Sequence, residues 1–176
     1  MRRYFVALGS NVGDRLATLT EGWARLRAIC GEGRLSRVYE TRPLYVTDQP
    51  LYLNAVAEMR CGLEPVEMLG ELNRIEAELG RDRSREIRMG PRTLDLDIVV
   101  SDTLVMDTPT LTIPHPRITE RQFVLVPLLE LAPDLVDPRT GLTFATALAV
   151  LQAREGTDAI HPYDTETRMR PFGPQT

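Results

Sequence analysis

The chain has 176 residues, of which 43% are hydrophobic and 26% are charged, and its formal net charge is −4. These values are typical of one globular domain. The negative net charge argues against a protein that binds nucleic acid or a membrane surface, and no apolar run approaches the roughly 18 residues of a membrane span. All 21 basic residues are arginine, which excludes lysine-dependent Schiff-base chemistry and a P-loop lysine and leaves arginine to bind any phosphate.

The first half of the chain predicts a strand, a helix and two further strands. Asp14 is typical of a helix N-cap, and the apolar residues after it recur at helical spacing. The segment Gly9–Gly13 resembles a glycine-rich phosphate loop, but without a lysine it is interpreted as a tight turn. The predicted elements are a strand over Arg3–Leu8, a helix over Arg15–Cys30, a strand over Leu35–Glu40, a loop over Thr41–Leu51 and a strand over Leu53–Cys61.

The second half predicts a helix, a strand and C-terminal additions. Pro65 favours a helix start, and apolar residues at helical spacing continue to Gly80. A polar loop over Arg81–Arg92, with five arginines and two acids, leads into a strand over Leu94–Val100. Two short extended pieces over Leu104–Met106 and Thr110–Ile113 precede helices over Arg121–Leu131 and Leu142–Leu151.

This order of elements predicts an α+β fold with a ferredoxin-like βαββαβ core. Such a core has a mostly antiparallel sheet with helices packed on it, and C-terminal additions follow it here. We expect one domain over residues 1–153 and a partly disordered tail over residues 154–176, which has few core-forming residues. Cys30 and Cys61 lack metal-type spacing, so reduced thiols in a cytoplasmic protein are expected.

Asp95 and Asp97 are the most informative pair in the sequence. Residues two apart in a strand share a face, so both carboxylates point the same way while the alternate apolar residues point the other way. Close carboxylates repel each other unless a cation lies between them, and oxygen ligands together with phosphates suit Mg²⁺. Arg92 adds a cation that can meet those phosphates. The alternative is an edge strand with a solvated polar face.

Arginines also surround other polar segments. The loop over Arg81–Arg92 is either a solvated surface or a lid that closes over a polyphosphate. His115 stands between two prolines, with Arg117 and Arg121 after it, which favours phosphate contact over a purely structural role. Tyr52 and Asn54 share a strand face, and an asparagine amide can bind the edge of a flat heterocycle, although an ordinary half-buried strand also fits them.

Five segments together resemble the 6-hydroxymethyl-7,8-dihydropterin pyrophosphokinase family. They are ALGSNVGDR, TRPLYVTDQPLYLNAV, RIEAELGR, GPRTLDLDIVV and PHPRITERQFVLVPLLELAPDL, and they extend to about Leu135. The resemblance implies transfer of pyrophosphate from ATP to a hydroxymethyl-dihydropterin in folate biosynthesis, with release of AMP. It also implies two Mg²⁺ ions, with ATP and the pterin as small-molecule partners. We further expect a monomer with no nucleic-acid or membrane partner.

The resemblance assigns roles to individual residues. Asp95 and Asp97 would hold the metal ions, and Tyr52 and Phe123 would enclose the pterin ring. The catalytic arginines would be Arg81, Arg83 and Arg92. The residues assigned to ATP are Asn73, Glu76, Ile98, His115, Arg117 and Arg121. Those assigned to the pterin are Thr41, Pro43, Leu44, Tyr52, Asn54 and Phe123.

Two departures and two alternatives accompany this assignment. Met89 stands where the family often has an aromatic residue, which implies weaker or different cover of the pterin, and the choice between Arg81 and Arg83 as main lid arginine stays open. A ferredoxin-like module that binds RNA is disfavoured by the 6% aromatic content and the acidic charge. A two-metal nucleotidyltransferase or phosphatase would leave the ring-binding residues unexplained.

Overall fold

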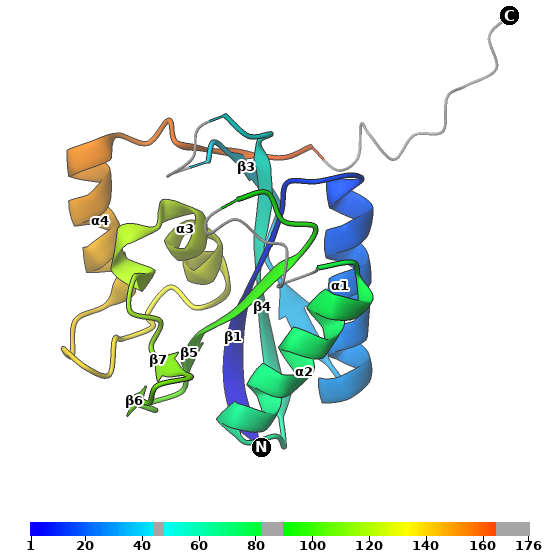
Figure 1. Ribbon diagram of the computed structural model, residues 1–176. Coiled ribbons are helices and arrows are strands. Elements are labelled where there is room, and N and C mark those ends of the chain that lie inside the picture. The colour runs from blue at the N-terminus through cyan, green and yellow to red at the C-terminus, as the bar shows by residue number, and fades with distance from the viewer. Residues whose placement is uncertain (44–47, 82–89, 165–176) are drawn as a thin grey trace, which may run out of the picture.

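One antiparallel sheet lies between two layers of helices in the computed structural model, which describes residues 1–43, 48–81 and 90–164 (Figure 1). Helices α1 (Arg15–Cys30) and α2 (Pro65–Glu78) cover one face, and α3 (Gln122–Leu131) lies on the other with α4 (Phe144–Glu155) beside it. The strands of the sheet are β1 (Arg2–Ser10), β2 (Gly33–Leu35), β3 (Tyr39–Thr41), β4 (Tyr52–Cys61), β5 (Asp95–Ser101) and β8 (Ile160–Pro162). The smaller elements are a hairpin of β6 (Met106–Asp107) and β7 (Thr112–Ile113) and a 3₁₀ turn, η1 (Ile118–Glu120).

The strand order confirms the predicted α+β, ferredoxin-like core. The order is β5-β1-β4-β3-β8, β2 also pairs with β4, and every pairing is antiparallel. The first strand of the chain therefore lies between the strands that precede and follow α2, as in a split βαβ unit. Helices α3 and α4 and strand β8 are the C-terminal additions.

Side chains along β1 point alternately to the two faces of the sheet, and the core therefore has two halves. Tyr4, Val6 and Leu8 point toward α1 and α2 and pack with their apolar residues, such as Leu72. Phe5 points the other way and packs against α3 and α4. Both faces of β1 are thus buried along most of its length, which makes it the central strand of the molecule.

Two predictions about the first half of the chain are wrong. The β1 strand does not end in a turn at Gly9, because Gly9 and Ser10 still pair with β4. The predicted strand over Leu35–Glu40 is two strands, because three residues between β2 and β3 oppose two residues of β4. Ser36 fills this irregularity: its N–H donates to the carbonyl of Val56, and its Oγ accepts from the N–H of Val56.

The segment after α4 adds an edge strand to the sheet. Residues Ile160–Pro162 pair with β3, and the N–H of Tyr163 donates to the carbonyl of Val38 over 2.8 Å. The expected tail over residues 154–176 therefore includes a strand, and residues 165–176 lie outside the described part of the chain. Among the described helices, none combines the length and the apolar character needed to cross a membrane.

Candidate functional site

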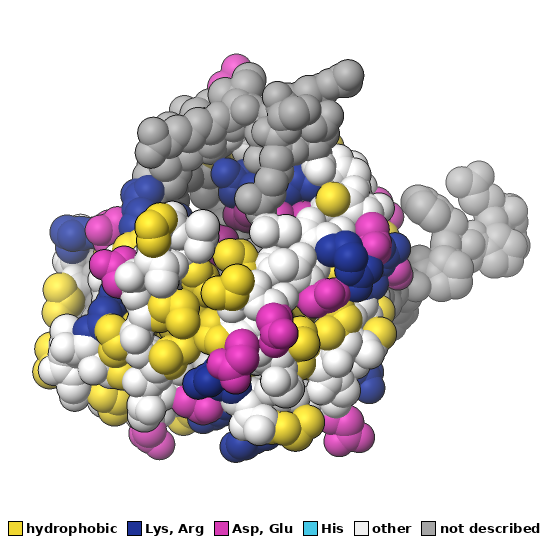
Figure 2. All heavy atoms as spheres, turned by 60° about the horizontal axis from the view of Figure 1, so that its bottom comes forward, with side chains coloured by type: hydrophobic (Ala, Val, Ile, Leu, Met, Phe, Trp, Pro, Cys, Tyr) yellow, Lys and Arg dark blue, Asp and Glu magenta, His cyan; other side chains and the backbone are white. Residues whose placement is uncertain are grey.

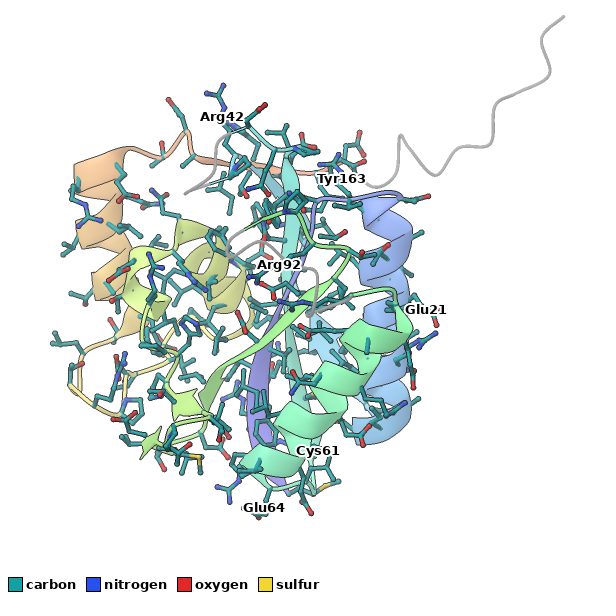
Figure 3. The ribbon with its side chains drawn as sticks, in the orientation of Figure 1. Glu21, Arg42, Cys61, Glu64, Arg92 and Tyr163 are labelled. Carbon is teal, nitrogen blue, oxygen red and sulfur yellow. The ribbon has the colours of Figure 1, made fainter. Side chains whose placement is uncertain are left out.

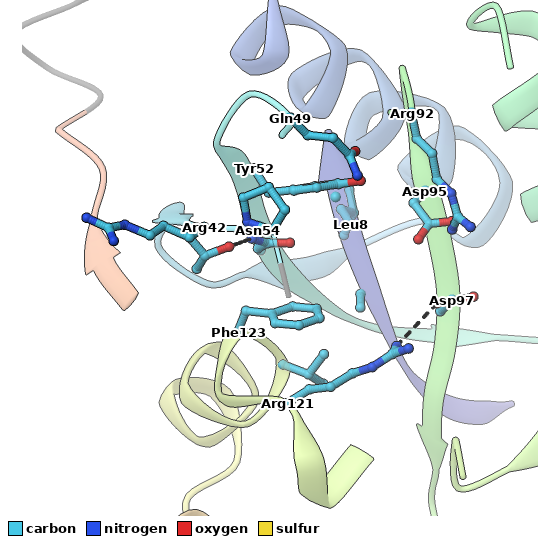
Figure 4. A pocket seen from close by; sticks show the side chains of 16 residues that line it. Leu8, Arg42, Gln49, Tyr52, Asn54, Arg92, Asp95, Asp97, Arg121 and Phe123 are labelled. Atoms are coloured by element: carbon cyan, nitrogen blue, oxygen red, sulfur yellow. Dashed lines mark hydrogen bonds and ion pairs between the residues drawn. The ribbon is translucent and has the colours of Figure 1, made fainter. Parts of the chain in front are cut away.

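A cavity of about 170 Å³ opens at the end of the sheet where β1 finishes and where β4 and β5 begin. It lies on the face that carries α3, between the strands and the first turn of that helix (Figure 4). Figure 3 places Arg42, which lines the cavity, at this end of the sheet, and Cys61 and Glu64 at the opposite end.

The register of three neighbouring strands sets the floor of the cavity. Gly9 of β1 pairs with Asn54 of β4 and with Asp95 of β5, so these residues form one row across the sheet. Ala7, two residues earlier on the same face, pairs with Asp97 in the next row. A Cβ atom on Gly9 would lie 3.3 Å from Oδ1 of Asn54. The two small residues of β1 therefore keep space between the polar side chains on either side.

One side of the cavity is shaped for a flat ring. Tyr52 of β4 and Phe123 of α3 lie on opposite sides of it (Figure 4). Asn54, 5% exposed, donates from Nδ2 to Oγ1 of Thr41 over 2.8 Å, which fixes its amide with Oδ1 toward Gly9. Two apolar ring faces and a fixed hydrogen-bonding amide together suit a planar heterocycle.

Two guanidinium groups converge on Asp95 at the other side of the floor. Oδ1 of Asp95 accepts from Nη1 of Arg81 over 2.6 Å and from Nη1 of Arg92 over 2.7 Å. Arg81 is only 6% exposed and also donates to Oε1 of Glu76, which lies on α2. Glu76 is 1% exposed and accepts the N–H of Leu96 as well, over 2.7 Å. Glu76 therefore holds Arg81 against Asp95.

Asp97 is the second carboxylate on this face of β5. Its side chain is 42% exposed to the cavity, yet surrounding protein atoms displace much of the bulk water. Burial, followed by the charge of Asp95, raises the pKa of Asp97 to about 6, and Arg121, 3.9 Å away, opposes this rise. The donor set consists of carboxylate oxygens alone, and no described histidine, cysteine or further acid completes a group of three. Such a pair suits Mg²⁺ that is shared with substrate phosphates.

Arg92 and Arg121 each keep a buried donor that no described residue accepts. The donor is Nε in both cases. The guanidinium carbon of Arg121 also lies 5.7 Å from the centre of the Phe123 ring. Because a buried donor without an acceptor is unfavourable, these two positions favour a ligand with anionic oxygens.

His115 lies in a turn beside β5, after the cis peptide bond between Ile113 and Pro114. Its N–H donates to the carbonyl of Val99 over 2.8 Å, and its Nδ1 accepts the N–H of Arg117 over 3.1 Å. Burial, followed by the charges of two nearby arginines, lowers the pKa of His115 to about 4. At neutral pH the ring is uncharged and carries its hydrogen on Nε2, which is a donor.

The structure brings many of the predicted site residues together. The cavity is lined by Thr41, Pro43, Tyr52, Asn54, Arg92, Asp95, Asp97, Arg121 and Phe123. The predicted ATP residues outside its lining are Asn73, Glu76, Ile98, His115 and Arg117, and the side chain of Ile98 packs in the opposite half of the core. Leu44, Arg83 and Met89 lie outside the described residues.

Several residues that line the cavity have no predicted site role. Gly9 belongs to the segment interpreted as a turn, and Gln49 precedes Pro50 in a predicted loop. The only sign of Gly9 in the sequence is that a small residue directly follows a strand pattern. Its importance depends on which strands flank β1, and no local pattern in the sequence gives that order.

Comparison with known proteins identifies the family of the chain. A family model described as 7,8-dihydro-6-hydroxymethylpterin-pyrophosphokinase (HPPK) matches residues 5–133. The 2-amino-4-hydroxy-6-hydroxymethyldihydropteridine pyrophosphokinase of Bacillus subtilis is 40% identical over 157 residues, which are 88% of this chain and 93% of that protein. The protein of the same name in Haemophilus influenzae is 43% identical over 141 residues, 77% of this chain and 85% of that protein.

Longer proteins match over a part of their length. The folic acid synthesis protein fol1 of Pneumocystis carinii is 43% identical over 144 residues, 81% of this chain and 19% of that protein, so the chain spans about a fifth of it. The crystal structure of wild-type Plasmodium falciparum HPPK-DHPS superposes with a TM-score of 0.69 at 12% identity, over 92% of this chain and 48% of that one. The structural match shows the shared fold.

Proposed function

Because the chain belongs to the 7,8-dihydro-6-hydroxymethylpterin-pyrophosphokinase family, we propose that it transfers pyrophosphate from ATP to 6-hydroxymethyl-7,8-dihydropterin in folate biosynthesis. The hydroxymethyl oxygen loses its proton to solvent and forms a bond to the β-phosphorus of ATP. The bond from that phosphorus to the oxygen bridging the α-phosphorus breaks, so AMP leaves. The observation that carries the proposal is the row of Asn54, Gly9 and Asp95 across three neighbouring strands. This row places the space for a flat ring directly beside the two carboxylates on the same face of the sheet.

The pterin half of the site consists of Tyr52, Phe123, Asn54 and Thr41. In the proposed complex the two aromatic rings cover the faces of the pterin, and Asn54, fixed by Thr41, binds its edge. The ring then lies over Gly9, and its hydroxymethyl substituent extends along the row toward Asp95. Leu44 is assigned to this half from the resemblance alone.

Asp95 and Asp97 fit Mg²⁺ because both carboxylates lie on one strand face and line the cavity, and because a cation would offset the burial and the charge of Asp95 that disfavour the ionised Asp97. We assign two ions to them, as the family resemblance implies. When bound, Mg²⁺ supplies charge stabilisation to the phosphate oxygens in the transition state. Asp97 must be ionised for this role, and Arg121 opposes the rise of its pKa.

The phosphates of ATP would be bound by arginine. Arg92 and Arg121 offer their Nε donors, and Arg81 is held in place by Glu76. His115 offers Nε2–H as a neutral donor toward ATP. The ATP contacts of Asn73, Ile98 and Arg117 and the role of Arg83 stay predictions from the resemblance. A monomeric, cytoplasmic state stays a prediction from the sequence.

A turnover assay tests the proposal. Protein incubated with ATP, Mg²⁺ and hydroxymethyl-dihydropterin is expected to form one AMP for each pterin diphosphate and no ADP, measured by anion-exchange chromatography. Omission of the pterin serves as the control. ADP formation, or AMP formation at the same rate without the pterin, would contradict the proposal and favour a phosphatase or nucleotidyltransferase.

The main alternative from another class is an RNA-binding module on the same fold. Such modules present aromatic side chains and a basic surface to the nucleic acid. Over the described residues of the face shown in Figure 2, acidic and basic side chains are mixed, in keeping with the net charge of −4. Tyr52 and Phe123 face each other across a cavity instead of lying flat on an open sheet. Both features favour the enzyme.

Gly9→Ala is expected to weaken pterin binding selectively. The added Cβ would lie 3.3 Å from Oδ1 of Asn54 and would occupy the floor below the ring. We expect the KM for the pterin to rise about tenfold while the KM for ATP changes less than about twofold, since a small displacement in a shaped site is costly. Steady-state kinetics with each substrate varied in turn measure both values.

The matched control is Gly62→Ala, where an added Cβ meets nothing within 4 Å. It should leave both KM values unchanged. Equal KM values for Gly9→Ala and wild type would show that the pterin does not lie over this row.

A further inference from the structure

Arg15 is the first residue of α1, the helix that packs on the face of the sheet opposite the cavity. Its Nη1 donates to the carbonyl of Leu51 over 2.7 Å, and its Nη2 forms an ion pair with Oε1 of Glu40 over 2.9 Å. The side chain is 20% exposed, and its guanidinium carbon lies 6.0 Å from the centre of the Tyr163 ring (Figure 3). One guanidinium group therefore connects α1 to β3, to the segment before β4 and to the residue after β8.

The helix that Arg15 begins does not account for an arginine at this position. The N-terminus of a helix carries partial positive charge, so a cation in the first turn is unfavourable. The first turn of α1, all of which is described, has no acidic side chain to offset this charge. Asp14 already caps the helix by accepting the N–H of Ala17 over 3.1 Å. The role of Arg15 therefore lies in its contacts with the strands.

These contacts flank the last residue pair between β3 and β4. Thr41 pairs with Tyr52 at that end of the ladder, and Glu40 and Leu51 directly precede these two residues in the chain. The pairing of β4 with β1 begins one residue later, so it does not include this end of β4. The end of a ladder opens more easily than its middle. Arg15 bonds to the chain beside both members of the pair and so opposes its opening.

Both members of this pair line the cavity, whereas Arg15 does not. Thr41 fixes the amide of Asn54 over 2.8 Å, and Tyr52 lies across the cavity from Phe123 (Figure 4). A small shift of the pair would change both the position of the amide and the width of the space between the two aromatic rings. Arg15 can therefore act on a ligand only through the residues that it holds.

We propose that Arg15 is a positioning residue for the pterin half of the site: it holds Thr41 and Tyr52 at the spacing that the pterin requires and takes no part in nucleotide binding. The proposal rests on the proposed function, because it takes the ring ligand to be the pterin. The alternative is that Arg15 only adds an ion pair to a partly exposed surface. In that case its loss would lower stability slightly and leave pterin binding unchanged.

The main test is Arg15→Met, which keeps an apolar stem and removes both contacts. We expect the KM for hydroxymethyl-dihydropterin to rise about tenfold, because a small displacement in a shaped site is costly. Its Kd should rise by the same factor, measured by calorimetry with the Mg²⁺ complex of an ATP analogue that has a methylene group between the α- and β-phosphorus atoms. The KM for ATP and kcat should stay within about twofold of wild type.

A second measurement needs no ligand. In Arg15→Met, hydrogen exchange followed by mass spectrometry should become faster over residues 48–54, because the end of the β3–β4 ladder is no longer held. Exchange over β1, which is paired on both sides, should stay unchanged.

Two further variants separate positioning from a general loss of stability. Arg15→Lys can keep one of the two contacts, so the KM and Kd for the pterin should rise only about threefold. Arg25→Met, on the same helix, also removes two ion pairs, with Glu21 and Glu78, and none of these three residues lines the cavity. It should leave the KM and Kd for the pterin and the exchange over residues 48–54 unchanged. Thermal melting of each variant reports any loss of stability.

The outcomes are distinct. If Arg15→Met folds and keeps the wild-type KM and Kd for the pterin, the proposal is wrong. It is also wrong if the KM values for the pterin and ATP rise by the same factor, or if exchange over residues 48–54 does not change. If Arg15→Met does not fold, Arg15→Lys decides, and a wild-type KM and Kd for the pterin in that variant overturn the proposal. ADP formation by the wild type would instead remove the proposed function, and faster exchange in Arg15→Met would then still show that Arg15 holds this end of the ladder.

Discussion

Asp97→Asn is expected to lower kcat by about a thousandfold and, in metal-free buffer, to raise the melting temperature at pH 7.5. Activity should fall because the carboxylate that we propose as a Mg²⁺ ligand is replaced by a neutral amide. Stability rises because the ionised Asp97 is disfavoured by burial and by Asp95, which together raise its pKa to about 6. Since the group is partly exposed, we expect a gain of only about 1 kcal/mol, or about 2–4 °C.

The gain in stability of Asp97→Asn should depend on pH. A carboxyl whose pKa is raised in the folded state from 3.8 to about 6 destabilises the fold above about pH 6 and no longer does so below pH 3.8. The gain in Asp97→Asn should therefore be present at pH 7.5 and disappear toward pH 4. Calorimetric melting at both pH values measures it. The exposed Asp158→Asn is the control and should show neither effect. Full turnover in Asp97→Asn would refute the metal-binding role.

Arg81→Met is expected to lower the free energy of unfolding by about 3 kcal/mol at pH 7, because it removes one partner of a buried ion pair. Glu76 is 1% exposed and Arg81 is 6% exposed, so little water can replace the guanidinium next to the Glu76 carboxylate. Methionine occupies similar volume, which limits the effect to lost charge and hydrogen bonding. Urea unfolding measures the change.

A second substitution should reverse much of this loss. In the double variant Glu76→Gln with Arg81→Met, the buried charge is removed, and we expect recovery of about 2 kcal/mol. The control is Arg74→Met on α2, the helix that carries Glu76. The ion pairs of Arg74 with Glu71 and Glu78 are about half exposed, so this change should alter stability by less than about 0.5 kcal/mol. Equal stabilities of Arg81→Met and Arg74→Met would show that the Glu76–Arg81 pair is not buried in solution.

Much of the site follows from local patterns in the sequence. The two-residue spacing of Asp95 and Asp97 predicts a shared strand face, and both line the cavity. The same spacing places Tyr52 and Asn54 together. These predictions succeed because a strand has a fixed period of two, which needs no knowledge of the neighbouring strands.

Other features depend on contacts between distant segments. The interruption at Ser36 arises from its pairing with Val56 in another strand, and its own sequence carries no signal for it. Glu76 is assigned to ATP from the resemblance, whereas its side chain is buried against Arg81 and the backbone of Leu96. Only the packing of α2 on β5 reveals that contact.

The row of Asn54, Gly9 and Asp95 has a consequence for the size of the substrate. Adjacent strands lie about 4.8 Å apart, so two ladder spacings separate Asn54 from Asp95 by about 10 Å. Strand β1 is hydrogen-bonded on both sides, so this separation can change only if the sheet itself opens. In the proposed complex, the sheet therefore favours a substrate by its length: the edge bound by Asn54 and the oxygen that accepts the pyrophosphate must lie far enough apart to match this spacing.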